Sequence, residues 1–314
     1  MAAHADWSVD PRKRWVALAL RQGAGWHVAA PVPVGPVADF LPALLARAER
    51  HGASGGVALG VDLPLGVPRA YAASLQEADF PAFLRGLRPD ADFFKMCSEL
   101  TELAAERPFY PMRGIRGMSR AAHAAALGLG GPAGLSRACD RATTERPAGA
   151  PLFWTLGANQ TGKAAIAAWR DMLLPAFAAG LPVRLWPFEG DFLSLLAPGA
   201  IALAETYPAE ALRHLGIGLK GSKRRQSDRA TCASRLRAAF ASLDAAPSTA
   251  LAAMIGDGFG GDAAGEDRFD CVLGVLCVIN VLAGNRPDAA PDDPWIRRWE
   301  GWVLGQTALP LDPA

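Results

Sequence analysis

The chain has 314 residues, 51% of them hydrophobic, which is enough for one large domain or two ordinary ones. Its formal net charge of +1 excludes a strongly basic or acidic protein, so any nucleic-acid partner must be met by local charge. Five widely spaced cysteines without a Cys-x-x-Cys pair indicate neither a disulfide framework nor a zinc ribbon. Without a signal-like segment or an apolar run of about 18 residues, we expect a cytoplasmic protein with no membrane partner.

The first sixty residues predict the order strand, strand, strand, helix, strand. A short apolar segment precedes Asp6, and residues 15–20 and 26–30 form two extended runs around a glycine turn at 23–25. Apolar residues at helical spacing then predict a helix up to about residue 50, followed by a buried strand at 57–62. An antiparallel three-stranded meander, a helix and a parallel strand form the opening order of the ribonuclease-H-like fold.

The rest of the chain predicts an α/β core interrupted by an insertion. Residues 63–150 are rich in Pro, Gly and Arg with short helical stretches, and we interpret them as a mostly helical capping insertion after the fourth strand. An apolar run at 151–156, a helix at 164–179, strands at 183–186 and 201–206 and a helix at 267–282 follow. We therefore expect a mixed sheet flanked by helices, with a discontinuous core of residues 1–62 and 151–290 and a C-terminal extension at 291–314.

Carboxylates follow three of the predicted strands. Asp6, Asp62 and Glu205 each end a short apolar run, and carboxylates at strand ends can converge in space. Asp62 is the most informative of them, because the segment Asp62-Leu-Pro-Leu-Gly-Val-Pro68 constrains the direction of the chain. Each acid alone is also typical of an ordinary strand end or turn, so the hypothesis rests on their combination.

A fourth acidic position lies at the start of the last strong helix. Asp267 and Asp270 are three residues apart and share one helix face near the N-terminus, where the helix dipole offsets part of their repulsion. Either acid alone is typical of a first helical turn. Hard oxygen ligands suit Mg²⁺ or Mn²⁺, and two such ions can activate water and stabilise a leaving oxygen in phosphodiester cleavage.

Basic residues gather between Arg213 and Arg237. Eight cations face a single acid there, and such a segment suits contact with a phosphate backbone. A solvated helix face, or a loop that pairs with acids elsewhere, would give the same pattern.

A second phosphate-binding pattern follows the apolar run at 151–156. Gly157-Ala-Asn-Gln-Thr-Gly162-Lys163-Ala164 matches a P-loop that follows a strand and opens a helix, but Ala164 lacks the hydroxyl that would bind Mg²⁺. Gln160 and Lys163 could instead reach a substrate phosphate from a helix start.

Several motifs together resemble the family catalogued as domain of unknown function 429, which is predicted to contain ribonuclease-H-like nucleases. The similar elements are the segment after Asp62, the box Glu205-Thr-Tyr207-Pro208, Ser222-Lys223 with Arg229, and the Asp267/Asp270 pair. Family members often carry Gly after the first acid, whereas Trp7 follows Asp6 here. The resemblance covers nearly the whole chain and implies a metal-dependent phosphodiesterase, without naming a substrate.

These observations give one leading function and two alternatives. The leading hypothesis is a Mg²⁺ or Mn²⁺ dependent nuclease, with a nucleic acid or nucleotide as substrate. Asp6, Asp62, Asp267 and Asp270 would bind metal, and Glu205 would ligate it or orient the attacking water. Substrate contacts would come from Gln160, Lys163, Tyr207, Lys220, Ser222, Lys223 and Arg229. The alternatives are a phosphotransferase or NTPase that uses the 157–163 loop, and a non-catalytic binding module.

Overall fold

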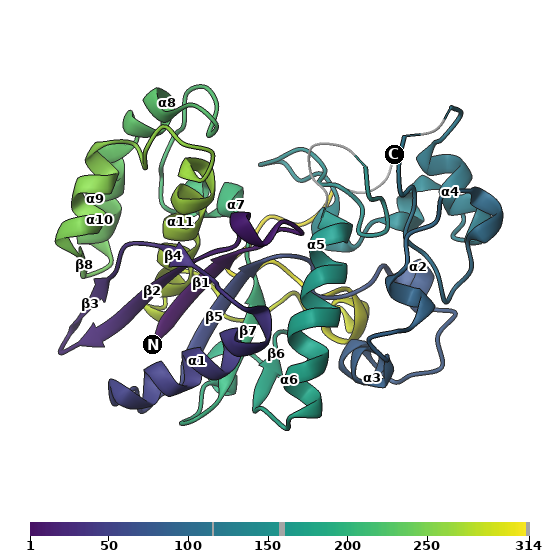
Figure 1. Ribbon diagram of the computed structural model, residues 1–314, viewed down its shortest axis with the longest axis horizontal. Coiled ribbons are helices and arrows are strands. Elements are labelled where there is room, and N and C mark those ends of the chain that lie inside the picture. Colours follow the sequence, from purple (N-terminus) through teal and green to yellow (C-terminus); the bar gives the residue numbers. More distant parts are fainter. Residues whose placement is uncertain (115, 157–160, 312–314) are drawn as a thin grey trace. The chain divides into compact units, whose positions relative to one another are not determined.

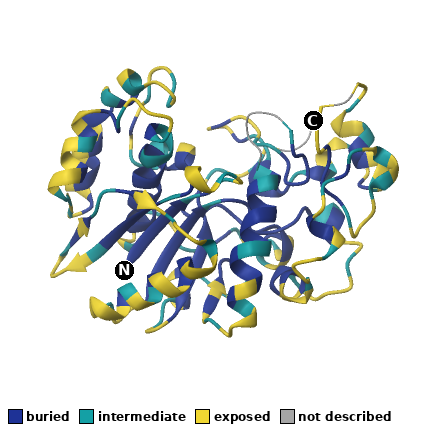
Figure 2. Ribbon diagram, in the orientation of Figure 1, coloured by how far each residue is buried: buried dark blue, intermediate teal, exposed yellow. Residues whose placement is uncertain are grey.

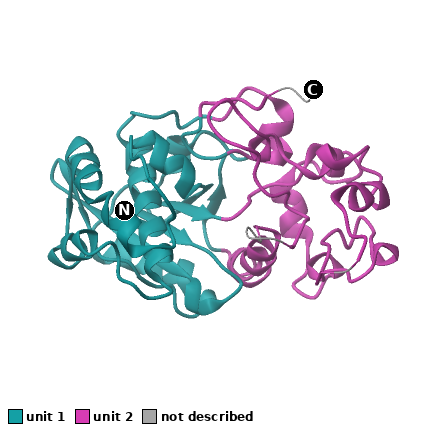
Figure 3. Cartoon of the chain, turned by 90° about the horizontal axis from the view of Figure 1, so that it is seen from above, with its two compact units in different colours: residues 1–62, 181–289, 303–306 teal, residues 63–180, 290–302, 307–314 magenta. Residues whose placement is uncertain are grey.

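A computed structural model describes residues 1–114, 116–156 and 161–311, and the chain divides into two units (Figure 3). Unit 1 comprises Met1–Asp62, Leu181–Ala289 and Val303–Gln306. Unit 2 comprises Leu63–Gly180, Ala290–Trp302 and Thr307–Ala314. Among the described residues, no helix combines the length and the apolar character that a membrane crossing requires.

Unit 1 is an α/β unit built on a mixed sheet (Figure 1). Across the described residues, eight strands pair in the order β6-β7-β5-β1-β2-β3-β8, with β4 also paired to β2. The strands are β1 Ala2–Asp6, β2 Trp15–Gln22, β3 Gly25–Val28, β4 Val32–Pro33, β5 Val57–Asp62, β6 Val183–Leu185, β7 Ile201–Glu205 and β8 Ala245–Pro247. β1, β2 and β3 form the predicted antiparallel meander, and β5 pairs in parallel with both β1 and β7.

Helices flank this sheet, with 3-10 or π helices labelled η. Those of unit 1 are η1 Pro11–Lys13, α1 Val37–Arg50, η7 Phe192–Leu195, α7 Pro208–His214, α8 Gln226–Ala230, α9 Ala233–Ser242, α10 Thr249–Gly256 and α11 Gly265–Leu282. The strands β1, β5 and β7 are buried almost throughout (Figure 2), as expected for a sheet covered on both faces.

Pleat alternation assigns α1 and α11 to opposite faces of the sheet. Trp7 follows β1 and its ring centroid lies 5.9 Å from that of Phe40 on α1. His4 has the opposite parity and packs against Gly274 of α11, so closely that a Cβ at residue 274 would overlap the imidazole. Since successive side chains of a strand point to opposite faces, α11 covers the face that carries His4, and also Asp6.

In its described residues, unit 2 is built from helices and loops. The helices are α2 Arg69–Ala72, α3 Phe80–Gly86, η2 Asp92–Phe94, η3 Leu100–Glu102, α4 Arg120–Ala126, η4 Pro132–Leu135, η5 Ala138–Asp140, α5 Thr161–Ala168, η6 Trp169–Leu173, α6 Leu174–Ala178 and η8 Ile296–Glu300. Edge-to-face aromatic pairs hold its core, such as Phe93 with Phe109 at 5.4 Å and Phe109 with Phe153 at 5.2 Å.

The close approach of α11 to β1 leads to a stability prediction. Gly274→Ala inserts a methyl group where the His4 ring lies, and we expect overpacking to lower the free energy of unfolding by about 1–3 kcal/mol. The matched control is Gly256→Ala on α10, where the new Cβ meets Arg237 at an ordinary 3.5 Å and Ala favours the helix by up to about 1 kcal/mol. Urea unfolding of both variants measures the difference, and equal stabilities would contradict the packing argument.

Candidate functional site

Three neighbouring parallel strands of unit 1 end in a carboxylate at the same edge of the sheet. Asp6 ends β1, Asp62 ends β5 and Glu205 ends β7. Asp6 and Asp62 are direct register partners, so their side chains point to the same face of the sheet from strands about 4.8 Å apart. This is the face that α11 covers.

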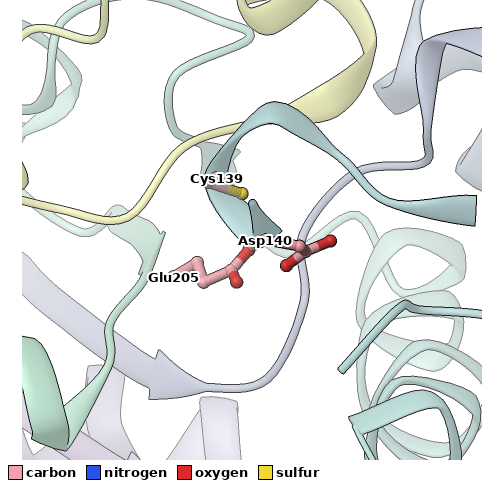
Figure 4. Close-up of side chains that lie close together, drawn as sticks. All are labelled: Cys139, Asp140 and Glu205. Atoms are coloured by element: carbon pink, nitrogen blue, oxygen red, sulfur yellow. The ribbon is translucent and has the colours of Figure 1, made fainter. Parts of the chain in front are cut away.

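Glu205 differs from Asp6 and Asp62 in its strand register. Its register partner is Val61 rather than Asp62, so the pleat directs its side chain toward the opposite face. Glu205 ends β7, and Figure 4 shows its side chain. It is fully buried, and its carbonyl oxygen accepts a hydrogen bond from the Leu304 amide at 2.9 Å. Glu205 therefore acts on Asp62 through its charge, which helps to raise the pKa of Asp62.

The N-terminal turns of α11 bring two more carboxylates to the Asp6 face. Asp267 and Asp270 share one side of the helix, and α11 packs on β1, β2 and β5. The pKa of Asp6 is raised well above its ordinary range by burial and then by the charges of Asp270, Asp62 and Asp267. Residues separated by more than 200 positions thus form one electrostatic group, which we call the carboxylate cluster: Asp6, Asp62, Asp267 and Asp270.

Burial dominates the electrostatics of this cluster. It raises the pKa of Asp62 to about 7, with a further contribution from Asp270, and the pKa of Asp267 to about 6. The pKa of Asp270 is also raised by burial, although the Lys223 ammonium opposes the shift. A carboxylate in this position is costly to ionise unless a cation lies beside it.

Lys223 supplies one such cation. Its Nζ lies 2.5 Å from Asp270 Oδ2, in a half-buried ion pair. Burial lowers the pKa of Lys223, but Asp270, with Asp62 and Glu266, raises it more. Lys223 is therefore charged, and it neutralises one of the four carboxylates.

Arg229 has a different role from the predicted phosphate contact. It is 1% exposed, and its Nε and Nη2 donate to the carbonyl oxygens of Gly258 at 2.9 Å and Gly260 at 2.6 Å. Its Nη1 donates to the carbonyl oxygen of Lys223. Because Arg229 is buried and its three guanidinium nitrogens each donate to a carbonyl oxygen, it fixes the backbone of the Lys223 segment, and direct binding of substrate phosphate does not fit its geometry.

The other predicted substrate contacts are Lys220 and Ser222, which lie on the same segment as Lys223, and Tyr207, which precedes α7. The Ser222 amide donates to Asp228 Oδ2 at 2.8 Å, and Ser222 Oγ accepts from the Arg224 amide at 3.3 Å, so this residue shapes the loop. Lys220 is exposed, and Tyr207 is half-buried immediately before α7. Among these three residues, Lys220 has the position of a surface cation.

The oxygen donors of the carboxylate cluster have the chemistry that a divalent cation prefers, although their spacing is wider than one shared ion requires. Within the described part of the chain, the buried oxygens Asp267 Oδ2 and Asp270 Oδ1 have no hydrogen-bond donor, and an unpaired buried carboxylate oxygen is costly without a cation. Four hard oxygen donors opposed by one ammonium match the preference of Mg²⁺ and Mn²⁺. In the described chain, however, no three cluster residues hold ligand atoms all within 4.8 Å, whereas one shared Mg²⁺ would draw its ligands to within about 4.2 Å.

The predicted P-loop falls in unit 2, and its residues 157–160, Gln160 included, lie outside the described residues. A P-loop follows a strand, but residues 151–156 form no strand, and only an isolated bridge joins Trp154 to Tyr110. Gly162 has a packing explanation, because a Cβ there would overlap the carbonyl oxygen of Leu152. Lys163 is half-buried in the first turn of α5. The expected strand at 151–156 was therefore wrong.

No sequence motif marks the buried polar residues of η5 in unit 2, where Cys139 and Asp140 lie (Figure 4). Arg137 donates to Asp140 at 2.9–3.1 Å from its backbone and its guanidinium, and also to the carbonyl oxygens of Leu65 and Glu300. The hydrogen bonds of Arg137 therefore link three segments of unit 2. An i, i+3 Arg and Asp pair between loops was the only local signal for them.

The chain has no significant match among protein-family models, curated proteins or solved structures.

The raised pKa of Asp62 predicts how stability depends on pH. Between about pH 4 and pH 7 the folded state keeps a proton on Asp62 that the unfolded state releases, so the free energy of unfolding falls as pH rises. We expect Asp62→Asn to remove a decrease on the order of 2 kcal/mol over this range.

Urea unfolding of chelator-treated protein at several pH values tests this prediction. Glu210 acts in the opposite direction, because partners that include His214 and Arg213 lower its pKa to about 2 despite its burial. The decisive quantity is therefore the difference in the free energy of unfolding between wild type and Asp62→Asn. Parallel pH profiles for the two proteins would contradict the assigned shift.

Proposed function

We propose that the chain is a Mg²⁺ or Mn²⁺ dependent phosphodiesterase that acts on nucleic acid. The observation that carries this proposal is the carboxylate cluster, in which acids from two parallel strands and one helix face form a single electrostatic group. Its buried oxygens without donors, on Asp267 and Asp270, point to a cation as the missing partner.

The strand order supports a ribonuclease-H-like fold for unit 1. The antiparallel β3-β2-β1 meander continues into the parallel strands β5 and β7, with α1 between β4 and β5 in the chain. The ends of β5 and β7 and the first turns of α11 also carry motifs that resemble the family of domain of unknown function 429. Because such folds host several reactions, the function is argued from the cluster and the fold serves as support.

A bound divalent cation would activate water and stabilise the leaving oxygen during hydrolysis of a phosphodiester. In that reaction the water oxygen bonds to phosphorus, the phosphorus bond to the leaving oxygen breaks, and one water proton passes to solvent while the leaving oxygen gains one. Asp6 and Asp62 from the sheet and Asp267 and Asp270 from α11 are the residues that would hold such a cation. The charge of the buried Glu205 helps to raise the pKa of Asp62.

The surface beside the cluster supports a phosphate-rich substrate. Lys220 and Arg224 are exposed on the segment that carries Lys223, and Arg229 anchors that segment through backbone carbonyl oxygens. Cations placed beside a carboxylate site hold the phosphates that flank the reacting one.

Cleavage of labelled DNA and RNA with Mn²⁺ tests the proposal. We expect Asp62→Asn and Asp270→Asn to lower the rate at least about 100-fold, since loss of outer-shell partners alone costs about 10–100-fold in metal sites. Isothermal titration should show Mn²⁺ binding to the wild type and weaker binding to both variants. The control is Asp39→Asn, which removes an exposed carboxylate from the first turn of α1.

Two results would overturn the proposal. One is a wild-type chain that neither binds Mn²⁺ nor cleaves any phosphodiester, and the other is cleavage that survives both cluster substitutions. Equal losses in Asp39→Asn would show a general effect of charge rather than a metal site.

A further inference from the structure

Lys13 is held on a short ordered helix between β1 and β2. Asp10 caps this helix η1 by accepting from the Arg12 amide at 3.0 Å, and Pro11 occupies its first position. The neighbouring Arg12 is committed to Asp10, with Nη2 2.9 Å from Oδ2. Lys13 follows it and is exposed.

Strand register and packing bring this loop beside the first turn of α11. Trp15, two residues after Lys13, is the register partner of Asp6 on β2. The guanidinium carbon of Arg268, which follows Asp267 on α11, lies 5.2 Å from the centroid of the Trp15 ring. Consistent with this placement, Lys13 lowers the pKa of Asp267 more strongly than Asp270 raises it.

The two lysines near the cluster differ in their partners. Lys223 is bound to Asp270, whereas the Lys13 ammonium has no hydrogen bond or ion pair within the described part of the chain. Lys13 acts on Asp267, while Lys223 acts on Asp270, Asp62 and Asp6. A substrate that contacted Lys13 and the segment of Lys223 would therefore span the whole carboxylate cluster.

We propose that Lys13 binds a phosphate adjacent to the scissile one, so that the site selects a polynucleotide over a small phosphodiester. This inference rests on the proposed function. The Lys13 ammonium is exposed and, among the described residues, has no hydrogen bond or ion pair, so it can bind a phosphate oxygen as a point charge. Sequence independence follows, because a phosphate contact carries no information about the base.

Lys13→Gln tests the proposal, with Arg12→Gln as the matched control that removes the adjacent, already paired cation. With a labelled oligonucleotide, we expect Lys13→Gln to raise KM several-fold with a smaller change in kcat. Fluorescence anisotropy should show weaker binding, with the slope of log affinity against log salt reduced by about 1. The loss in kcat/KM should be larger for the oligonucleotide than for bis(p-nitrophenyl) phosphate.

The possible outcomes distinguish the contact of Lys13 with a phosphate from catalysis of phosphodiester cleavage. Equal effects of Lys13→Gln and Arg12→Gln, or equal losses on both substrates, would overturn the contact. A wild type that binds the oligonucleotide without cleaving it, and loses that binding specifically in Lys13→Gln, would keep the contact and remove the catalytic proposal. A wild type that does not bind the oligonucleotide would remove the Lys13 contact itself.

Discussion

The close packing of α11 on β1 determines where the carboxylates meet. At its centre the fully buried imidazole of His4 lies against the backbone of Gly274, and any side chain there would separate helix and sheet. Among the described residues neither ring nitrogen of His4 has a hydrogen-bond partner, and burial lowers its pKa to about 3, so the ring is neutral. Unsatisfied buried polar atoms cost on the order of 1–3 kcal/mol, so the rest of the core must offset this contact. The contact fixes the position of α11 along β1. With Gly274 packed against His4 of β1, the first turns of α11 reach the strand ends that carry Asp6 and Asp62.

Much of unit 1 could be predicted from the sequence because its signals are local. β-branched and apolar runs between glycine turns identify β2 and β5, and the long apolar helix after Asp267 is visible from composition alone. β8 was missed because Ala245–Pro247 has no β-branched residue, and it is a strand only through its parallel pairing with β3. The apolar run at 151–156 gave the opposite error, since tertiary packing in unit 2 can bury such a run without a sheet.

The site shows the same division between local and tertiary information. Asp62 could be singled out because prolines fix the chain after it, and Asp267 and Asp270 because helix periodicity pairs them. No sequence pattern could distinguish Arg229, whose donors are taken by backbone carbonyl oxygens, from a surface cation in the same basic segment. Lys13 had no signal at all, because its proximity to Asp267 results from the packing of two segments that are distant in sequence.

The ion pair of Lys223 with Asp270 bears on both the electrostatic cost of the buried cluster and the proposed function. Without it, the pKa values of Asp270 and Asp6 would be raised further, because the Lys223 ammonium lowers both, and ionising these buried acids would cost more. The Lys223 ammonium binds one oxygen of Asp270 at 2.5 Å, while Asp270 Oδ1 and Asp267 Oδ2 have no donor in the part of the chain that the structure describes. A divalent cation carries twice that charge and accepts several oxygens at once, so it can offset repulsion that lysine leaves in place. The same ion pair therefore lowers the cost of ionising the cluster and leaves two carboxylate oxygens for the cation that we propose.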